Sequence, residues 1–306
     1  MIRTGIAGGA GEDAGELIRI LVNHPDVELI FVQGPGMEGR DVSDVHHGLV
    51  GELSMKMTDH VTVDDIDLLF VADSGFYDSE LYSNGLPDEL RVIDMTGSDR
   101  VSSESVAGVS EIYRKQLVRG AHRAHLLHPL ASGALVALYP LAMHLLLKEV
   151  CGDFALPSSM ISGQNVQRAM RTAEEALAAV QRSFDETIRI EGITGIPGRD
   201  MRLRFTFPCS LSSDDVANLY EGIYDDHNFT FLTSTQRPGE EVVGTNRCLI
   251  HISKPDRQTL SIELIADARM RGGAGEAVHV MNLLFGLHEK TGLALKASAY
   301  SVSQGM

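Results

Sequence analysis

The chain has 306 residues, of which 43% are apolar, and this length and composition suit two domains with ordinary hydrophobic cores. Its 26 basic and 42 acidic residues give a net charge of −16, which disfavours nucleic acid and anionic membranes as partners. The 3 cysteines form no CxxC pair, which disfavours a disulfide framework or cysteine zinc cluster, and no apolar run approaches the ~20 residues that span a bilayer.

The first half of the chain alternates strand and helix patterns. A strand is predicted at 2–7, directly at the start, which leaves no room for a signal peptide and leads us to expect a soluble cytoplasmic protein. A glycine turn follows, and then a helix with apolar spacing at 14–23. Further short apolar runs predict strands at 27–32, 67–72 and 91–95. Short buried strands separated by helices predict a doubly wound parallel α/β sheet of the Rossmann type.

The second half has a different pattern. Apolar spacing predicts helices at 134–150, 166–189 and 213–224, and a last helix at 275–285. Strands are predicted between them, at 201–207, 229–233, 247–252 and 260–265. Long antiparallel strands with helices on one face make an α+β domain.

Three blocks of sequence, in this order, carry a resemblance to a known family. The first is the glycine turn Gly8–Ala14 with the helix that follows, and the second is Val92–Arg100. The third and most specific is Ala268–Leu287, followed by Glu289-Lys-Thr-Gly-Leu293. Together they resemble N-acetyl-gamma-glutamyl-phosphate reductase, whose relatives include aspartate-semialdehyde dehydrogenase.

The resemblance implies an organisation and a class of ligands. In the family the last helix returns to the first domain, so we expect a dinucleotide-binding domain at 1–134 and 271–306 and an α+β substrate domain at 135–270. It implies NADP or NAD as cofactor and a small amino-acid-derived substrate. Relatives assemble through the second domain, so we also expect a homodimer or homotetramer.

The glycine turn is the predicted phosphate-binding element. A helix that begins at such a turn presents backbone N–H groups and a positive dipole end to a phosphate. Gly8 and Gly11 allow the turn, and Ala14 permits close packing of helix on strand. The alternative interpretation is that these glycines only allow the chain to turn between strand and helix, without binding a phosphate. Glu12 and Asp13 stand where the family usually has Tyr and Thr, and they would repel a pyrophosphate unless they point to solvent or cap the helix.

The end of the second predicted strand leaves the choice of cofactor open. The family often carries an arginine there for the adenosine 2′-phosphate, whereas this chain has no charge at 33–36, and Arg40 is the substitute candidate. No acidic residue at 33–36 is available for a free ribose 2′-hydroxyl either. Gly272, Gly275 and Asn282 match positions near the nicotinamide half in relatives, with tight packing as the equal alternative for the glycines.

The expected nucleophile and its base are both missing. The family loop Asn-Pro-Gly-Cys-Tyr-Ala-Thr-Ala matches the segment 126–134 here, and Ala131 stands at the cysteine position. A methyl group cannot attack an acyl phosphate. The family's histidine base is absent too, since no histidine occurs between His144 and His227. Cys209 is a candidate thiol to replace the missing one, and a small core residue is the alternative interpretation.

We therefore expect a diverged NAD(P)-dependent oxidoreductase. It would reduce a carbonyl or imine of an amino-acid-derived metabolite, because hydride transfer to such a centre needs proton donation but no thioester. The alternative is a non-catalytic homologue that binds a metabolite or a partner protein. The ordinary family reaction survives only if another thiol enters the site.

Three residues are candidates for the replacement chemistry. His128 stands where the family has asparagine and can act as a general acid if its pKa lies near the working pH, the alternative being a hydrogen-bonded loop histidine. Ser132 is a possible nucleophile without an identifiable base. Arg100 matches a family arginine near the substrate, an ion pair being the alternative. No metal site is predicted, because His122 and His128 on one strand would lie ~20 Å apart.

Overall fold

The chain folds into two compact units. The structure, a computed structural model, describes residues 1–98, 100, 102–185 and 187–297. One unit comprises Met1–Leu127 with Gly273–Ala294, and the other comprises His128–Gly272 with the described residues after Ala294. The chain thus enters the second unit several residues earlier than the expected boundary at 134, because the helix that begins at Pro129 belongs to that unit.

The first unit is built on the predicted doubly wound parallel sheet. Its strands are β1 (Ile2–Ala7), β2 (Val27–Gln33), β3 (Leu68–Val71), β4 (Arg91–Asp94), β5 (Val106–Ala107) and β6 (Arg123–His125). They lie in the order β2-β1-β3-β4-β6-β5, and every neighbouring pair is parallel. The order reverses between β1 and β3, so the topological switch point of the sheet is there. The predicted Rossmann-type arrangement is confirmed.

Helices α1 (Glu12–Leu21) and α4 (Ser110–Val118) both pack against α8 (Ala274–Leu284). Every residue of α8 is buried, as expected of a helix that is covered on all sides. Shorter elements follow the strands: α2 (Val42–Val45), α3 (Glu80–Ser83), and the 3₁₀ turns η1 (His47–Leu49) and η2 (Ser74–Asp78). The last helix therefore lies within the first unit, as predicted.

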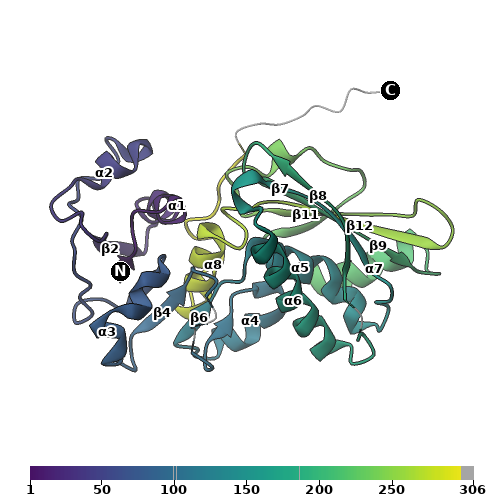
Figure 1. Cartoon of the computed structure of the whole chain (residues 1–306), viewed down its shortest axis with the longest axis horizontal. Helices are drawn as coiled ribbons and strands as arrows, with labels where there is room; N and C mark the ends of the chain where they lie inside the picture. The colour runs from purple at the N-terminus through teal and green to yellow at the C-terminus, as the bar shows by residue number, and fades with distance from the viewer. Residues whose placement is uncertain (99, 101, 186, 298–306) are drawn as a thin grey trace. The chain divides into compact units, whose positions relative to one another are not determined.

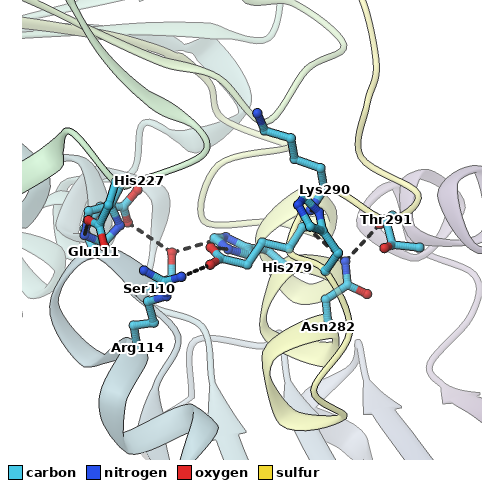
Figure 2. Close-up of polar contacts among 11 residues, drawn as sticks. Ser110, Glu111, Arg114, His227, His279, Asn282, Lys290 and Thr291 are labelled. Carbon is cyan, nitrogen blue, oxygen red and sulfur yellow. Dashed lines mark hydrogen bonds and ion pairs between the residues drawn. The ribbon is translucent and has the colours of Figure 1, made fainter.

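The side chain of Asn282 ties α8 to both ends of this unit. Its Nδ2 donates to the carbonyl oxygens of Thr291 at 2.9 Å (Figure 2) and of Glu289 at 3.1 Å. Its Oδ1 lies 3.1 Å from Nε2 of His24. Burial lowers the pKa of His24, and the Asp26 N–H donates to its Nδ1, so Nε2 carries the proton and donates to Asn282. Every polar atom of this buried amide is therefore satisfied.

The carboxylate of Glu289 joins a second set of buried groups. Nε2 of His279 lies 2.7 Å from one carboxylate oxygen, and Arg114 pairs with the other at 2.5 Å. Nδ1 of the same histidine lies 3.1 Å from the hydroxyl of Ser110, and Figure 2 shows the ring between its neighbours. Because Ser110 and His279 are buried, this chain of contacts holds α4, α8 and the following turn together rather than facing a substrate.

The second unit is a six-stranded mixed sheet. Its strands are β7 (Cys151–Pro157), β8 (Arg189–Ile196), β9 (Asp200–Pro208), β10 (Thr230–Thr233), β11 (Cys248–Ser253) and β12 (Thr259–Asp267), in the order β10-β11-β12-β9-β7-β8. The central pairs are antiparallel as predicted, but β10–β11 and β7–β8 are parallel. Strands β7 and β8 were not predicted, and the expected helix at 166–189 ends at Val180.

Its helices are α5 (Pro129–Met143), α6 (Gly163–Val180) and α7 (Ser213–Tyr224), with the 3₁₀ turns η3 (Ser158–Met160) and η4 (Gly239–Glu241). Helices α5 and α7 pack against the sheet, and α6 packs against α5 (Figure 1). The approach is close, since a Cβ on Gly133 of α5 would lie 2.6 Å from the side chain of Leu203 in β9. This face of the sheet is therefore the core of the unit.

Helix α5 tolerates an internal proline because a neighbouring helix compensates for it. Pro140 has no N–H, so the carbonyl of Val136, four residues earlier, loses its helical donor. The hydroxyl of Tyr224 donates to that carbonyl at 2.8 Å, and the hydroxyl of Tyr220 donates to the carbonyl of Ala137. Helix α7 thus supplies the hydrogen bonds that keep α5 continuous.

We predict that Asn282→Ala lowers the free energy of unfolding by about 2–3 kcal/mol, because it leaves two buried carbonyl groups and a histidine N–H without partners. Urea unfolding followed by circular dichroism measures the change. Asn84→Ala, at an exposed position, is the matched control and should change stability by less than about 0.5 kcal/mol. Equal stabilities for the two variants would contradict the structural role of Asn282.

Candidate functional site

The glycine turn after β1 is held tightly by its neighbours. Gly8 has φ +85°, and a Cβ there would lie 2.2 Å from Cβ of Asp73. Its N–H donates to Oε1 of Gln33 at 3.0 Å, and the N–H of Gly9 donates to the carbonyl of the same residue at 2.6 Å. Glycine is required at position 8 for conformation and for the close approach of the loop after β3.

The start of α1 is open where a phosphate would approach. A Cβ on Gly11 would meet no atom within 4 Å, and this N-cap residue contributes no side-chain cap. Ala14 is fully buried, as its predicted packing role requires. Glu12 and Asp13 are exposed in the first turn. The end of α1 thus keeps the geometry that favours an anion, beside two carboxylates that oppose one.

A cavity of about 390 Å³ lies at the carboxyl ends of β1, β2 and β3. These are the strands on either side of the switch point, where open α/β sheets bind their ligands. Its lining comes from the segments that follow the three strands: Gly8, Gln33, Pro35, Asp59, His60, Val61, Asp73, Gly75, Phe76, Ser79 and Leu81. The cavity has the location and size for one half of a dinucleotide.

Two carboxylates line this cavity, and sequence reasoning identified neither as a site residue. Asp73 follows β3 and caps the next turn by accepting the Gly75 N–H at 2.7 Å. Asp59 accepts the N–H groups of Met37 and Glu38 on one oxygen, at 3.0 and 3.2 Å. A polar residue directly after a buried strand was the available signal for Asp73. Asp59 had no such signal, because it follows an irregular segment.

Arg40, the candidate for a 2′-phosphate, is not among the described residues that line the cavity. Its side chain is exposed, while its backbone N–H donates to Met37 and its carbonyl accepts from Met57. A contact of Arg40 with a 2′-phosphate stays a prediction.

The residues expected near the nicotinamide half have packing roles in this structure. Gly272 has φ +73°, and a Cβ there would lie 2.6 Å from Cα of Pro129, so the start of α5 requires glycine. Gly275 is buried in the first turn of α8. Both polar atoms of the Asn282 amide are engaged with His24, Glu289 and Thr291, and its contact with the nicotinamide half stays a prediction.

The segment expected to be a loop is the first turn of α5. His128 is its N-cap: Nδ1 accepts the Leu130 N–H at 3.2 Å, and the carbonyl accepts the N–H groups of Ala131 at 2.8 Å and Ser132 at 3.0 Å. Pro129 occupies the first helical position, where a missing N–H costs nothing. Ala131 and Ser132 are fully buried, which argues against Ser132 as an accessible nucleophile.

His128 is held in the neutral form. Burial, with a smaller contribution from the positive charge of Arg168, lowers its pKa to about 4. Because the Leu130 N–H donates to Nδ1, the ring proton sits on Nε2. An imidazolium that donates its proton near neutral pH, as the sequence suggested, is therefore not the form present. The form present is a neutral imidazole whose N–H can donate a hydrogen bond.

The other histidines of this region have separate partners. Nδ1 of His125 lies 3.0 Å from the hydroxyl of Ser105, and Nδ1 of His122 lies 2.8 Å from the carbonyl of Asp88. Burial lowers the pKa of His125. Within the part of the chain that the structure describes, no group of three His, Cys, Asp or Glu side chains is arranged to hold a metal ion.

Arg100 forms an ion pair, which was the alternative interpretation. Its Nη1 lies 2.8 Å from the Asp78 carboxylate, its Nη2 donates to the Tyr77 carbonyl at 2.9 Å, and the guanidinium lies over the Tyr77 ring. The side chain is half exposed, so the pair contributes little stability and leaves the guanidinium within reach of solvent.

The cysteines lie at different distances from the start of α5. Met201, at the beginning of β9, packs against Gly133, whereas Cys209 follows the far end of that strand, ~26 Å away at 3.3 Å per residue. Cys209 is therefore not the thiol that replaces a nucleophile at position 131. Cys248 pairs with Ala266, which pairs with Met201, so it lies in the same row of the sheet, but it is fully buried.

Comparisons with known proteins agree on the kind of chain. Residues 3–119 match the semialdehyde dehydrogenase NAD-binding domain. The chain is 34% identical to N-acetyl-gamma-glutamyl-phosphate reductase from Parabacteroides distasonis, over 98% of this chain and 100% of that protein. The enzyme of the same name from Christiangramia forsetii is 30% identical with the same coverage.

Solved structures show the same fold. Aspartate-semialdehyde dehydrogenase from Francisella tularensis superposes with a TM-score of 0.67 at 12% identity, over 93% of this chain and 100% of that one. The enzyme from Candida albicans, solved with NADP, superposes with a TM-score of 0.62 at 11% identity, over 93% of this chain and 98% of that one. Among the described helices, none is both long and apolar enough to cross a membrane.

The lowered pKa of His128 predicts a dependence of stability on pH. The unfolded histidine, with a pKa near 6.5, takes up a proton before the folded one, whose pKa is about 4. Stability is therefore complete above pH 6.5 and is lost as the pH falls towards 4, by about 3 kcal/mol in all. His128→Asn keeps a cap and removes the titration. Urea unfolding between pH 4 and 8 should show this loss in the wild type relative to the variant, and parallel curves would refute it.

Proposed function

The chain belongs to the N-acetyl-gamma-glutamyl-phosphate reductase family of NAD(P)-dependent oxidoreductases, and from this premise we propose a diverged reductase that works without a thioester. Its substrate is a carbonyl or imine of an amino-acid-derived metabolite. The observation that carries the proposal is the first turn of α5, where Ala131 stands at the position that resembles the family's cysteine and His128 caps the helix.

The first unit fits the nicotinamide cofactor that the family implies. The cavity at the switch point, the open approach to Gly11 and the buried Ala14 suit a dinucleotide, whose reduced ring supplies a hydride. Gly8 and Gly11 are then the residues that form the phosphate turn. Gly272 and Gly275 shape the backbone at the starts of α5 and α8.

His128 is the proposed polar group for the reacting carbonyl or imine. A neutral imidazole whose Nε2 carries the proton can donate a hydrogen bond to an oxygen or nitrogen that gains negative charge as hydride arrives. The reaction then needs no attacking group, which is consistent with a methyl group at position 131 and a buried Ser132. Arg100, half exposed on its ion pair, is the proposed anchor for a substrate carboxylate.

A second candidate function is supported by the first turn of α1. Glu12 and Asp13 place two negative charges at the helix end where a pyrophosphate would sit, and they weaken nucleotide binding unless they remain turned to solvent. A non-catalytic homologue that binds a metabolite or a partner protein would tolerate this arrangement.

We predict that the purified protein lacks acyl-phosphate reductase activity. Phosphate-dependent oxidation of N-acetylglutamate semialdehyde should run roughly 10⁴-fold or more below the Parabacteroides distasonis enzyme assayed in parallel, because the nucleophile and base act as a unit. Consumption of NADH or NADPH with free semialdehydes and cyclic imines should be measurable in the same protein. Turnover of the acyl phosphate would reject the proposal, and replacing each of the three cysteines with serine in turn would then identify the thiol. No activity with any substrate would favour the non-catalytic alternative.

We also propose a homodimer or homotetramer formed through the open face of the second sheet. Met201 and Leu203 face α5, so the alternating Arg202 and Arg204 lie on the opposite face. Both pair with the buried carboxylate of Glu263. Because these charges are already paired, they can be buried in a subunit interface together with apolar groups.

Light scattering at micromolar concentration should therefore give the mass of a dimer or tetramer. Phe231 is 42% exposed at one end of this face, and Phe231→Asp should shift the assembly towards the monomer by raising the dissociation constant about tenfold or more. Val118→Asp, at an exposed apolar residue of the first unit, is the control that should leave the mass unchanged. A monomeric wild-type protein would contradict the assembly.

A further inference from the structure

The cavity at the carboxyl ends of β1, β2 and β3 bears on which nucleotide the chain takes. In sheets of this kind the residue beside the end of the second strand contacts the adenosine ribose: an acidic side chain there binds the 2′-hydroxyl of NAD, and an arginine binds the 2′-phosphate of NADP. Sequence reasoning left the choice open because the segment 33–36 carries no charge. The fold brings another segment to this position.

Gln33, the last residue of β2, is engaged in holding the site together. Its Oε1 accepts the Gly8 N–H at 3.0 Å, and its Nε2 donates to the carbonyl of Asp59 at 3.3 Å. Its backbone also forms a parallel bridge with Thr58. The excursion after β2, residues 34–58, thus returns alongside the strand end and sets Asp59 next to it.

The carboxylate of Asp59 is fixed in place and lines the cavity. One carboxylate oxygen accepts two backbone N–H groups, from Met37 and Glu38. The backbone N–H of Asp59 in turn donates to the Glu38 carboxylate at 2.6 Å. These reciprocal bonds hold two negative charges together at the end of β2.

The described residues that line the cavity offer no basic side chain of Lys or Arg to offset these charges. His60 is the member of the lining that can become positive. Arg40 lies outside the lining, and Lys56 of the same excursion pairs with Asp41 at 2.6 Å. A 2′-phosphate, with a charge near −2, would therefore face carboxylates without a cationic partner.

We propose that this cavity selects NAD(H) over NADP(H), with Asp59 as the specificity-determining residue and Glu38 reinforcing it. Asp59 accepts a hydrogen bond from a ribose hydroxyl and repels a 2′-phosphate. The inference rests on the proposed function, because it needs the cavity to bind a nicotinamide dinucleotide. It goes beyond that function because it states which of the two cofactors, NAD(H) or NADP(H), the chain prefers.

The test is calorimetric titration of the full-length protein with NADH and with NADPH. It is done at pH 8, above the ordinary pKa of an imidazole. We expect NADH to bind roughly 30-fold more tightly than NADPH, a difference of about 2 kcal/mol. Raising the salt from 0.05 to 0.5 M should narrow the ratio, because screening weakens repulsion between exposed charges.

Two variants assign the effect. Asp59→Asn keeps the acceptor oxygen for the two backbone N–H groups and removes the charge, so the ratio should fall below about threefold, mainly because NADPH binds better. Asp64→Asn, at an exposed acidic residue outside the cavity lining, is the matched control and should keep the wild-type ratio. An equal effect of both variants would overturn the role of Asp59.

The outcomes also separate the inference from the proposed function. Wild-type protein that binds NADPH as tightly as NADH, or more tightly, would overturn the selectivity and leave the dinucleotide site standing. Protein that binds neither nucleotide at millimolar concentration would reject both. Selective NADH binding that Asp59→Asn abolishes and Asp64→Asn preserves would support the inference.

Discussion

The amide of Asn282 is the interaction on which the first unit depends. The unit is assembled from two separate stretches of chain, and this buried side chain bonds to His24 from one stretch and to the turn after α8 from the other. Glu289 adds contacts to Arg114 and His279. The most family-like block of sequence therefore has a structural role, because it joins the two stretches of chain that make up the first unit. A buried amide with every atom paired is costly to replace.

The cavity proposed to bind the nucleotide lies at the carboxyl ends of the strands of the same unit. The segments after β1, β2 and β3 meet there, and each contributes a residue whose side chain or conformation is fixed by hydrogen bonds: Gly8, Asp59 and Asp73. Fixed carboxylates discriminate between ligands by charge at little cost in entropy, because the protein has already ordered them on folding. The proposed reacting group, His128, belongs to the other unit, where a helix cap and burial fix both its tautomer and its charge.

Local signals predicted elements well wherever the local sequence decides them. Helix α7 was predicted with its observed bounds, since Ser212 and Asp215 form a capping box and apolar spacing follows. The predicted ends of α5 and α6 were wrong for one shared reason. The buried side chain of Gln181 bonds to both the N–H and the carbonyl of Leu147, so the chain leaves both helices to make this contact. The local pattern of either segment cannot predict a partner that is 34 residues away.

The sequence by itself determined the parallel α/β sheet, the family, and the alanine at position 131, because periodicity and residue identity are properties of the chain. Tertiary structure decided the rest of the candidate site. Asp59 reaches the end of β2 only because an irregular excursion folds back on it, and the buried hydrogen bonds of Asn282 join segments that are far apart in the sequence. The charge of His128 follows from desolvation, which depends on what packs around the ring. Proximity and burial arise between segments distant in sequence, so only the folded chain contains them.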